Sequence, residues 1–322
     1  MNATRYQREL SAAAALAVLL AVVALRAPSF FAAGNLRDLA VNNSPALLVA
    51  AGMTLVILVG DIDISVASQF AVCSVACGWL VKLGLPTVAM VPLVLAAGML
   101  MGACNGALIA FAGLPSIIVT LAMLVAWRDA LRWATGGAWV QGLPADFQWL
   151  GMSQSAAQWV IVACSVGIVA LIAWAMRYMT GMRGLYAVGS DADAARLAGL
   201  DPVRVRFMVF VAMGGLVAVG AMLNAIRFSS IPGNAGAGLE LKTIAAVVVG
   251  GTAITGGRGN LLGTFIGVTL LSAIGTALSF VGINPFWERA IQGLIILMAL
   301  GADYAFAQWN PRALVPARAH DG

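Results

Sequence analysis

Long apolar runs alternate along the chain with short polar or glycine-rich interruptions. Because an α-helix rises about 1.5 Å per residue, about 20 apolar residues are enough to cross the hydrocarbon core of a bilayer. Runs close to that length are found at residues 11–27, 39–59, 64–81, 87–111, 115–133, 157–177, 206–226, 240–255, 261–281 and 287–308. The pattern therefore predicts an all-α, polytopic membrane helix bundle of about ten transmembrane segments, forming a single domain over residues 1–322.

Two of these runs allow a second interpretation. Segment 240–255 opens with Glu240 and Lys242 and ends in the glycine-rich run 250–260, so it is a candidate for a broken or re-entrant helix. Run 11–27 follows two arginines and has the shape of a cleavable signal peptide as well as of a first span. We expect it to be retained. No convincing tandem repeat accompanies the runs.

Composition supports a membrane protein. Apolar residues make up 61% of the chain and charged residues 10%, whereas a soluble domain carries roughly 25% charged residues. The mean hydropathy is +0.95. The net charge of +5 comes from Lys and Arg scattered between apolar runs, so we expect positively charged cytoplasmic loops and no nucleic-acid partner.

The positive charges also predict an orientation. Arg5 and Arg8 place the N-terminus in the cytoplasm, because cytoplasmic loops are enriched in Lys and Arg. Six crossings later the connection 178–205 should face the same side, and it is the densest cationic stretch of the chain. After ten crossings the tail 309–322 should be cytoplasmic as well. The chain is therefore expected in a membrane, with both termini on the cytoplasmic side.

The residues needed for most membrane enzymes are missing from the sequence. His320 is the single histidine, and the glycine-rich run 250–260 lacks the Lys-Ser/Thr of a phosphate-binding loop. The four cysteines lie inside apolar runs and are interpreted as small core residues, neither disulfides nor metal ligands: Cys73, Cys77, Cys104 and Cys164. We expect no enzyme activity, cofactor or metal in this chain.

The sharpest polar interruption is GDIDIS, residues 60–65. Asp61, Asp63 or Ser65 could cap the next helix, since a side-chain oxygen there satisfies free amide groups. Alternatively, the interruption lines a solute path. The two interpretations are compatible.

Other polar residues near or inside spans also leave two interpretations open. Asn105, Asn224 and Gln292 are expected to hydrogen-bond between helices, and the alternative is contact with a solute. The group Arg128, Asp129 and Arg132 is flanked by tryptophans, which favours a local pair at the outer membrane boundary over a channel lining.

Four separated segments resemble one protein family. They read AGMTLVILVGDIDISVAS (51–68), NGALIAFAGLPSIIVTLAML (105–124), AVGSDADAARLAGLDP (187–202) and GAGLELKTIAAVVVGGTAITGGRGNLLGTFIGV (236–268). The chain resembles the permease subunits of bacterial ABC importers for sugars, of the ribose, xylose, rhamnose and autoinducer-2 type. It departs from the family pattern at Asp61, Ile64 and Asp191, where Gly, Leu and Asn are usual.

This resemblance implies an importer with several components. Two permease chains form the path, two cytoplasmic ATPase subunits drive it, and a periplasmic binding protein delivers the sugar. Segment 178–205 is then the cytoplasmic coupling loop, and its region 193–200 has helical composition. The coupling residues implied are Gly189, Asp193, Arg196, Leu197 and Gly199. The candidate pathway or structural residues are Asp61, Asp63, Ser65, Asn105, Thr120, Gly256 and Gly257.

The finer resemblance is to rhamnose-type permeases, through GLPSIIVTLAMLVAWRDALRW and GLPADFQWLG, with autoinducer-2 permeases next. Two other functions are kept as alternatives. Asp61 and Asp63 could relay protons in a stand-alone secondary transporter. The same pair could hold magnesium in a membrane enzyme, although no second acidic cluster accompanies it.

Overall fold

The structure is a computed structural model that describes residues 7–284, 287–294 and 297–298, and the described part is helical apart from turns and an isolated bridge between Val140 and Ile231. The α-helices are α1 (Gln7–Arg26), α2 (Ala33–Leu58), α3 (Val66–Lys82), α4 (Thr87–Gly106), α5 (Ser116–Thr135), α6 (Gln154–Tyr178), α7 (Thr180–Ser190), α8 (Ala192–Leu197), α9 (Pro202–Ala225), α10 (Leu239–Val249) and α11 (Leu261–Phe280). Short turns of other helix types lie at Pro28–Phe31, Ala107–Phe111 and Gln148–Gly151. The predicted all-α helix bundle is confirmed.

Five of the described helices are long and apolar enough to cross a membrane: α2, α4 with its π-helical end, α6, α9 and α11. The apolar stretches Leu10–Arg26 and Val66–Lys82 are shorter. Because α3 and α10 are short, ten runs in the sequence do not amount to ten full-length spans. The number of crossings stays a prediction.

Most predicted runs match a helix within a few residues. The largest differences are at α2, which begins six residues before run 39–59, and at α10, which ends at Val249 where the glycine-rich run begins. The last run, 287–308, is helical where it is described, at 287–294 and 297–298. The tail 309–322 and His320 lie outside the described residues.

Helix α2 lies at the centre of the bundle. Every residue from Ser44 to Leu58 is buried, since α6, α9, α10 and α11 all pack against it. A helix that is apolar on all sides is suited to such a buried position. Pro45 lies inside this buried stretch. Its missing N–H frees the carbonyl of Val41, which accepts from Nη1 of Arg227 at 3.5 Å.

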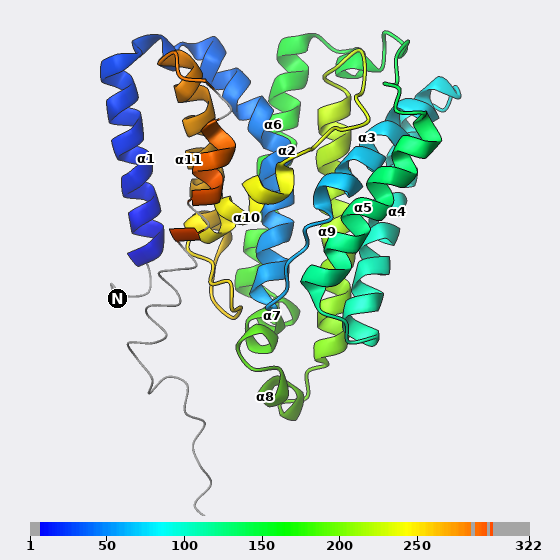
Figure 1. The fold of residues 1–322 in the computed structure, drawn as a ribbon, viewed down its shortest axis with the longest axis vertical. Coiled ribbons are helices and arrows are strands. Elements are labelled where there is room, and N and C mark those ends of the chain that lie inside the picture. The colour runs from blue at the N-terminus through cyan, green and yellow to red at the C-terminus, as the bar shows by residue number, and fades with distance from the viewer. Residues whose placement is uncertain (1–6, 285–286, 295–296, 299–322) are drawn as a thin grey trace, which may run out of the picture.

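The chain repeats one arrangement in opposite directions (Figure 1). α2 runs toward the end of the bundle that carries α7 and α8, residues 59–65 turn back as an extended segment, and α3 begins partway along the bundle. α9 runs the other way, residues 226–238 turn back, and α10 begins partway along. The packing relates the two halves in the same way. The helices that follow α2, namely α3 and α4, pack on α9, and the helices that follow α9, namely α10 and α11, pack on α2. This is the element order of an inverted repeat.

Glycines allow the closest helix contacts. On α4, a Cβ added at Gly98 or Gly102 would overlap the backbone of α9 at Gly214 or Phe210. On α11, a Cβ on Gly267 would overlap the carbonyl of Ala246 in α10. These glycines therefore form packing faces between helices.

The interpretation of the cysteines is partly wrong. Cys73 and Cys77 are buried in α3, as expected, and all four cysteines are free thiols. Cys104 is exposed and Cys164 is half-buried, because α4 and α6 turn only narrow faces toward the bundle. Hydropathy alone cannot tell a residue in the core from one on the outer face of a membrane helix.

Candidate functional site

The extended segment between α2 and α3 returns the chain to the interior of the bundle. α2 ends at Leu58, and Gly60 adopts φ +83°, a left-handed value that glycine favours. The amide of Asp61 donates to the carbonyl of Val56 at 3.1 Å, which closes the turn. Asp61 and Asp63 belong to the predicted polar interruption. Both residues are buried, and both lie in the segment between α2 and α3.

Asp63 forms a fully buried polar cluster with three other side chains. Its Oδ1 accepts from the amide and the hydroxyl of Ser65 at 2.9 and 2.5 Å. Its Oδ2 accepts from Gln69 Nε2 at 3.2 Å and from Asn105 Nδ2 at 3.5 Å. Buried carboxylates need such partners, since an unpaired charge in the core is costly. The cluster joins the start of α3 to α4.

These contacts test the capping interpretation of residues 60–65. Ser65 stands at the start of α3 and makes no side-chain cap bond to the first turn, so the capping interpretation is wrong for this residue. Asp63 accepts from the backbone amide of Ser65 itself and from no backbone amide further into α3. The interpretation of Asn105 as an interhelical contact is confirmed, because its Nδ2 also donates to Ser65 Oγ at 2.8 Å.

Asp61 has a different partner. Its Oδ2 lies 3.0 Å from Nε of Arg206 in the first turns of α9, and Nη2 of Arg206 donates to Oδ1 at 3.4 Å. The Asp61 side chain is only 5% exposed. This pair was not predicted from the sequence. A usable signal was present, since Asp61 is the first charge after one apolar run and Arg206 is the last charge before another.

The start of α5 holds the same extended segment from another side. Ser116 Oγ accepts from the amide of Ile62 at 3.3 Å, and Thr120 Oγ1 donates to the carbonyl of Ile62 at 3.3 Å. Thr120, a predicted site residue, thus joins Asp61, Asp63 and their partners in one region. Segment 59–65 is tied to α4, α5 and α9 together.

A tight contact of backbone on backbone joins α7 to this region. A Cβ added at Gly189 would overlap the carbonyl oxygen of Leu58, and the same oxygen accepts from the amide of Gly257 at 2.9 Å. Gly256, with φ +88°, leaves no room for a side chain beside Gly60. We call these contacts among Leu58, Gly60, Gly189, Gly256 and Gly257 the glycine junction. Tyr186 supports it by donating to the carbonyl of Gly259 at 3.0 Å.

The coupling residues predicted from the resemblance fall into two places. Gly189 lies inside α7, within the glycine junction. Asp193, Arg196, Leu197 and Gly199 are exposed on or just after α8. α8 spans Ala192–Leu197, so the helix expected at 193–200 is shorter, and α7 was not predicted. Asp191 caps α8 by accepting from the amides of Asp193 and Ala194.

α8 projects from one end of the bundle (Figure 1). Leu197 is 91% exposed there. A single exposed leucine is common on protein surfaces, so it is the projection of α8 that makes this end accessible to a partner.

An open cavity of about 240 Å³ lies between α5 and the start of α10. It is lined by Leu124, Val125, Arg128, Asp129, Arg132, Ala237 and Glu240. Arg132 and Asp129 form the predicted local pair at 3.1 Å, and both are exposed. With two arginines and two carboxylates, the charges of the lining balance, and guanidinium and carboxylate groups can both hydrogen-bond to hydroxyls.

The remaining predicted polar residues lie apart from this site. Gln292 is buried and donates to Glu288 within its own helix, while Asn224 is half-buried near the end of α9. Among the described residues, no three His, Cys, Asp or Glu side chains are grouped to hold a metal ion.

The comparisons with known proteins agree on one class. Residues 35–300 match the family model described as branched-chain amino acid transport system / permease component. The chain is 33% identical over 296 residues to the autoinducer 2 import system permease protein LsrC of Enterobacter sp. (strain 638), covering 92% of this chain and 86% of that protein. It is also 33% identical over 298 residues to the ribose import permease protein RbsC of Escherichia coli (strain K12), covering 90% and 91%.

A second autoinducer 2 import system permease protein, from Klebsiella pneumoniae, is 34% identical over 300 residues, covering 92% of this chain and 86% of that protein. No solved structure matches the chain.

Proposed function

This chain belongs to the permease component family of the branched-chain amino acid transport system type, and on that premise we propose that it is the membrane-spanning permease subunit of an ATP-driven importer for a sugar. The relatives named above are import permeases, and the match to this chain covers almost their whole length. The chain itself carries no phosphate-binding loop. ATP hydrolysis is therefore assigned to separate ATPase subunits.

One structural observation carries this proposal: α8 projects from the bundle and is attached through α7 to the glycine junction. A force applied to α8 reaches segment 59–65 and the glycine-rich loop after α10 through contacts without flexible side chains. We assign Asp193, Arg196, Leu197 and Gly199 to the surface that meets the ATPase, and Gly189 to the connection with the core.

The solute proposed is a neutral monosaccharide. The balanced charges around the cavity between α5 and α10 suit a molecule with many hydroxyl groups and no net charge. The relatives are named for ribose and for autoinducer 2, whereas rhamnose rests on the resemblance of residues 113–133 and 142–151 alone. Rhamnose is the first sugar to test, and autoinducer 2 is the second candidate because two of the three relatives carry that name.

The assembly proposed contains two permease chains, two ATPase subunits and a periplasmic binding protein. Both termini and segment 178–205 face the cytoplasm in this arrangement, in agreement with their positive charge. A proton-driven transporter fits the site less well, since Asp61 is paired with Arg206 and Asp63 is enclosed by hydrogen bonds.

The test is uptake of radiolabelled rhamnose and ribose into vesicles that contain the permease, its ATPase subunits and the binding protein. We expect accumulation that requires ATP and both subunit types. Accumulation that continues after deletion of the ATPase would exclude the importer. Loss of accumulation on addition of an ionophore, with ATP held constant, would favour the proton-driven alternative.

A further inference from the structure

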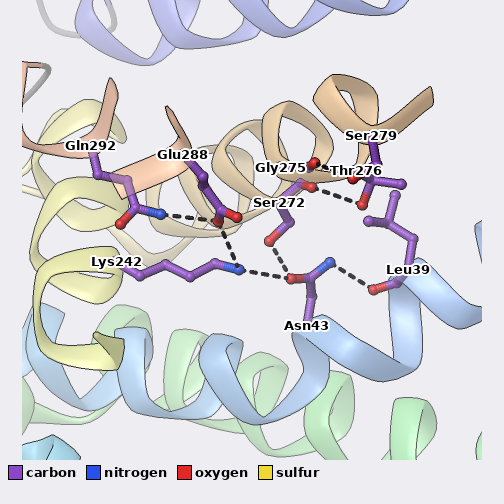
Figure 2. A network of polar contacts seen from close by, with 9 residues as sticks. All are labelled: Leu39, Asn43, Lys242, Ser272, Gly275, Thr276, Ser279, Glu288 and Gln292. Carbon is purple, nitrogen blue, oxygen red and sulfur yellow. Dashed lines mark hydrogen bonds and ion pairs between the residues drawn. The ribbon is translucent and has the colours of Figure 1, made fainter. Parts of the chain in front are cut away.

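Polar side chains from four helical segments meet inside the bundle beside the short helix α10 (Figure 2). Asn43 comes from α2, Lys242 from α10, Ser272 from α11, and Glu288 and Gln292 from the helical residues 287–294. This network is separate from the Asp63 cluster and contains the ion pair between Lys242 and Glu288. Ionisable side chains at membrane depth are rare and usually functional.

The bonds of this network differ in tightness. Ser272 Oγ donates a short bond to Asn43 Oδ1, and Gln292 Nε2 donates to Glu288 Oε1 at 3.0 Å. Lys242 Nζ lies farther from both acceptors, at 3.4 Å from Asn43 Oδ1 and 3.8 Å from Glu288 Oε1. Strong charge-assisted bonds of this type measure about 2.7–2.9 Å. Lys242 is the loosest member of the network.

The two ends of α10 are held in different ways. Toward its C-terminal end, Ala246 and Gly250 touch the backbone of α11 so closely that no side chain fits at Gly250 or at Gly267. Its N-terminal end follows the non-helical residues 226–238, and its N-cap is Gly238, which has φ +90°. There Lys242 reaches Glu288, with 23% and 27% of the two side chains exposed, and the guanidinium of Arg289 lies beside Gly238. The start of α10 is therefore attached to the last described helix by side chains, the loose ion pair and Arg289.

The same end of α10 borders the cavity described above. Ala237 and Glu240, on either side of Gly238, line it opposite α5. A displacement of the start of α10 must change the width of this cavity, because its other wall belongs to α5. This half-buried ion pair is a poor source of stability, since desolvation and solvent screening both offset the attraction, so its presence calls for another role.

We propose that the ion pair between Lys242 and Glu288 is a positioning contact that holds the start of α10 in the present conformation and separates during the transport cycle, so that the cavity between α5 and α10 changes shape. This inference rests on the proposed function. The contact between Asn43 and Ser272, which joins α2 to α11, stays closed throughout.

The first test measures distances in the complex of permease and ATPase subunits in nanodiscs. Spin labels are placed on Leu241→Cys and Trp287→Cys, exposed neighbours of the ion pair, in a chain whose four natural cysteines are replaced by alanine and whose Lys242 and Glu288 are kept. Between the nucleotide-free and the ATP–vanadate states, we expect the distance distribution of this pair to move outside its starting range. The matched control, Leu36→Cys on α2 with Leu262→Cys on α11, both exposed, is expected to keep its distribution.

A label on Leu197→Cys distinguishes failure of this inference from failure of the proposed function. If that label responds to the ATPase subunits while the distance between the labels at 241 and 287 stays constant, the importer stands and this inference is wrong. If the label does not respond to them, the proposed function fails and the inference fails with it.

A second test uses no cysteines. Lys242→Met with Glu288→Met removes both charges while keeping the apolar volume, and we expect normal amounts of protein in the membrane. Stimulation of ATP hydrolysis by the binding protein should fall about fivefold or more, the lower end of typical coupling between sites. Lys242→Arg, which keeps the charge, should retain the stimulation. Full stimulation in the double Met variant would mean that the pair is only structural.

Discussion

Arg206 at the start of α9 and Asp61 after α2 are 145 residues apart in the chain and form a 3.0 Å ion pair. The pair fastens segment 59–65 to the base of α9. Because Asp61 is buried and Arg206 is 38% exposed, removing the arginine leaves a carboxylate with no cation and little water. The pair therefore contributes more than an ordinary surface contact.

A double-mutant cycle measures this contribution. With Asp61→Asn, Arg206→Gln and the combined variant, we expect a coupling energy of about 1–2 kcal/mol from unfolding in detergent, within the range for side chains in contact. The control is the pair Arg204 and Asp201 on the same first turn, whose side chains are 83% and 49% exposed. Its coupling should stay below about 1 kcal/mol. Equal couplings for both pairs would contradict the role assigned to Asp61.

The glycine junction predicts that Gly189→Ala damages the protein. The added methyl group overlaps the carbonyl of Leu58, so α7 must shift, and overpacking of this kind costs about 1–3 kcal/mol. We expect lower thermal stability and loss of ATP-driven uptake. Gly181→Ala in the same helix is the control, because nothing lies within 4 Å of its Cβ position. That variant should be neutral or slightly more stable, since Ala favours a helix more than Gly does, and comparable damage in both would contradict the role given to the close contact at Gly189.

The interface of α4 and α9 offers a comparison between neighbouring residues. A Cβ at Gly214 would overlap the backbone of Gly98, whereas a Cβ at Gly215 would meet Met99 at an ordinary 3.4 Å. Gly214→Ala should lower the melting temperature in detergent by the equivalent of about 1–3 kcal/mol. Gly215→Ala should leave it nearly unchanged. The reverse order would show that α4 and α9 do not pack as described.

The surface of α8 predicts a loss of partner binding without a loss of stability. Leu197→Asp changes a side chain that is 91% exposed, so the melting temperature should be unchanged. Co-purification with the ATPase subunits and stimulated ATP hydrolysis should be lost, and Arg196→Glu should behave in the same way. Leu83→Asp is the control, because Leu83 is 76% exposed in the connection after α3, far from α8. Retained ATPase binding by the Leu197 variant would move the docking surface elsewhere.

Hydrophobic runs predicted most of the helices because lipid leaves little choice. An uninterrupted apolar stretch must form a helix there to satisfy its backbone, so α5 and α11 begin and end within two residues of the prediction. The short α10 was also visible, since Glu240, Lys242 and the following glycines interrupt the apolar pattern. α7 was not visible, because a short helix outside the membrane leaves no apolar run.

The candidate site was harder to predict for a physical reason. Asp61, Asp63 and Asn105 could be named from their polarity, but their partners depend on which helices meet. Arg206, the partner of Asp61, comes from α9. Gln69, a partner of Asp63, comes from a later position in α3. The capping rule assumes that the hydroxyl oxygen of the first residue is free to accept from the first turn of the helix. At the start of α3, the Ser65 hydroxyl is already bonded to Asp63 and Asn105.

The central position of α2 has a consequence for biogenesis. α2 is synthesised early, yet the helices that enclose it, α6, α9, α10 and α11, emerge from the ribosome much later. Until those helices are inserted, polar groups of α2 such as Asn43 and Thr54 are surrounded by lipid or by the insertion machinery. Maturation of this protein must therefore end with late segments closing over an early one, so truncation before α10 should leave α2 exposed to quality control.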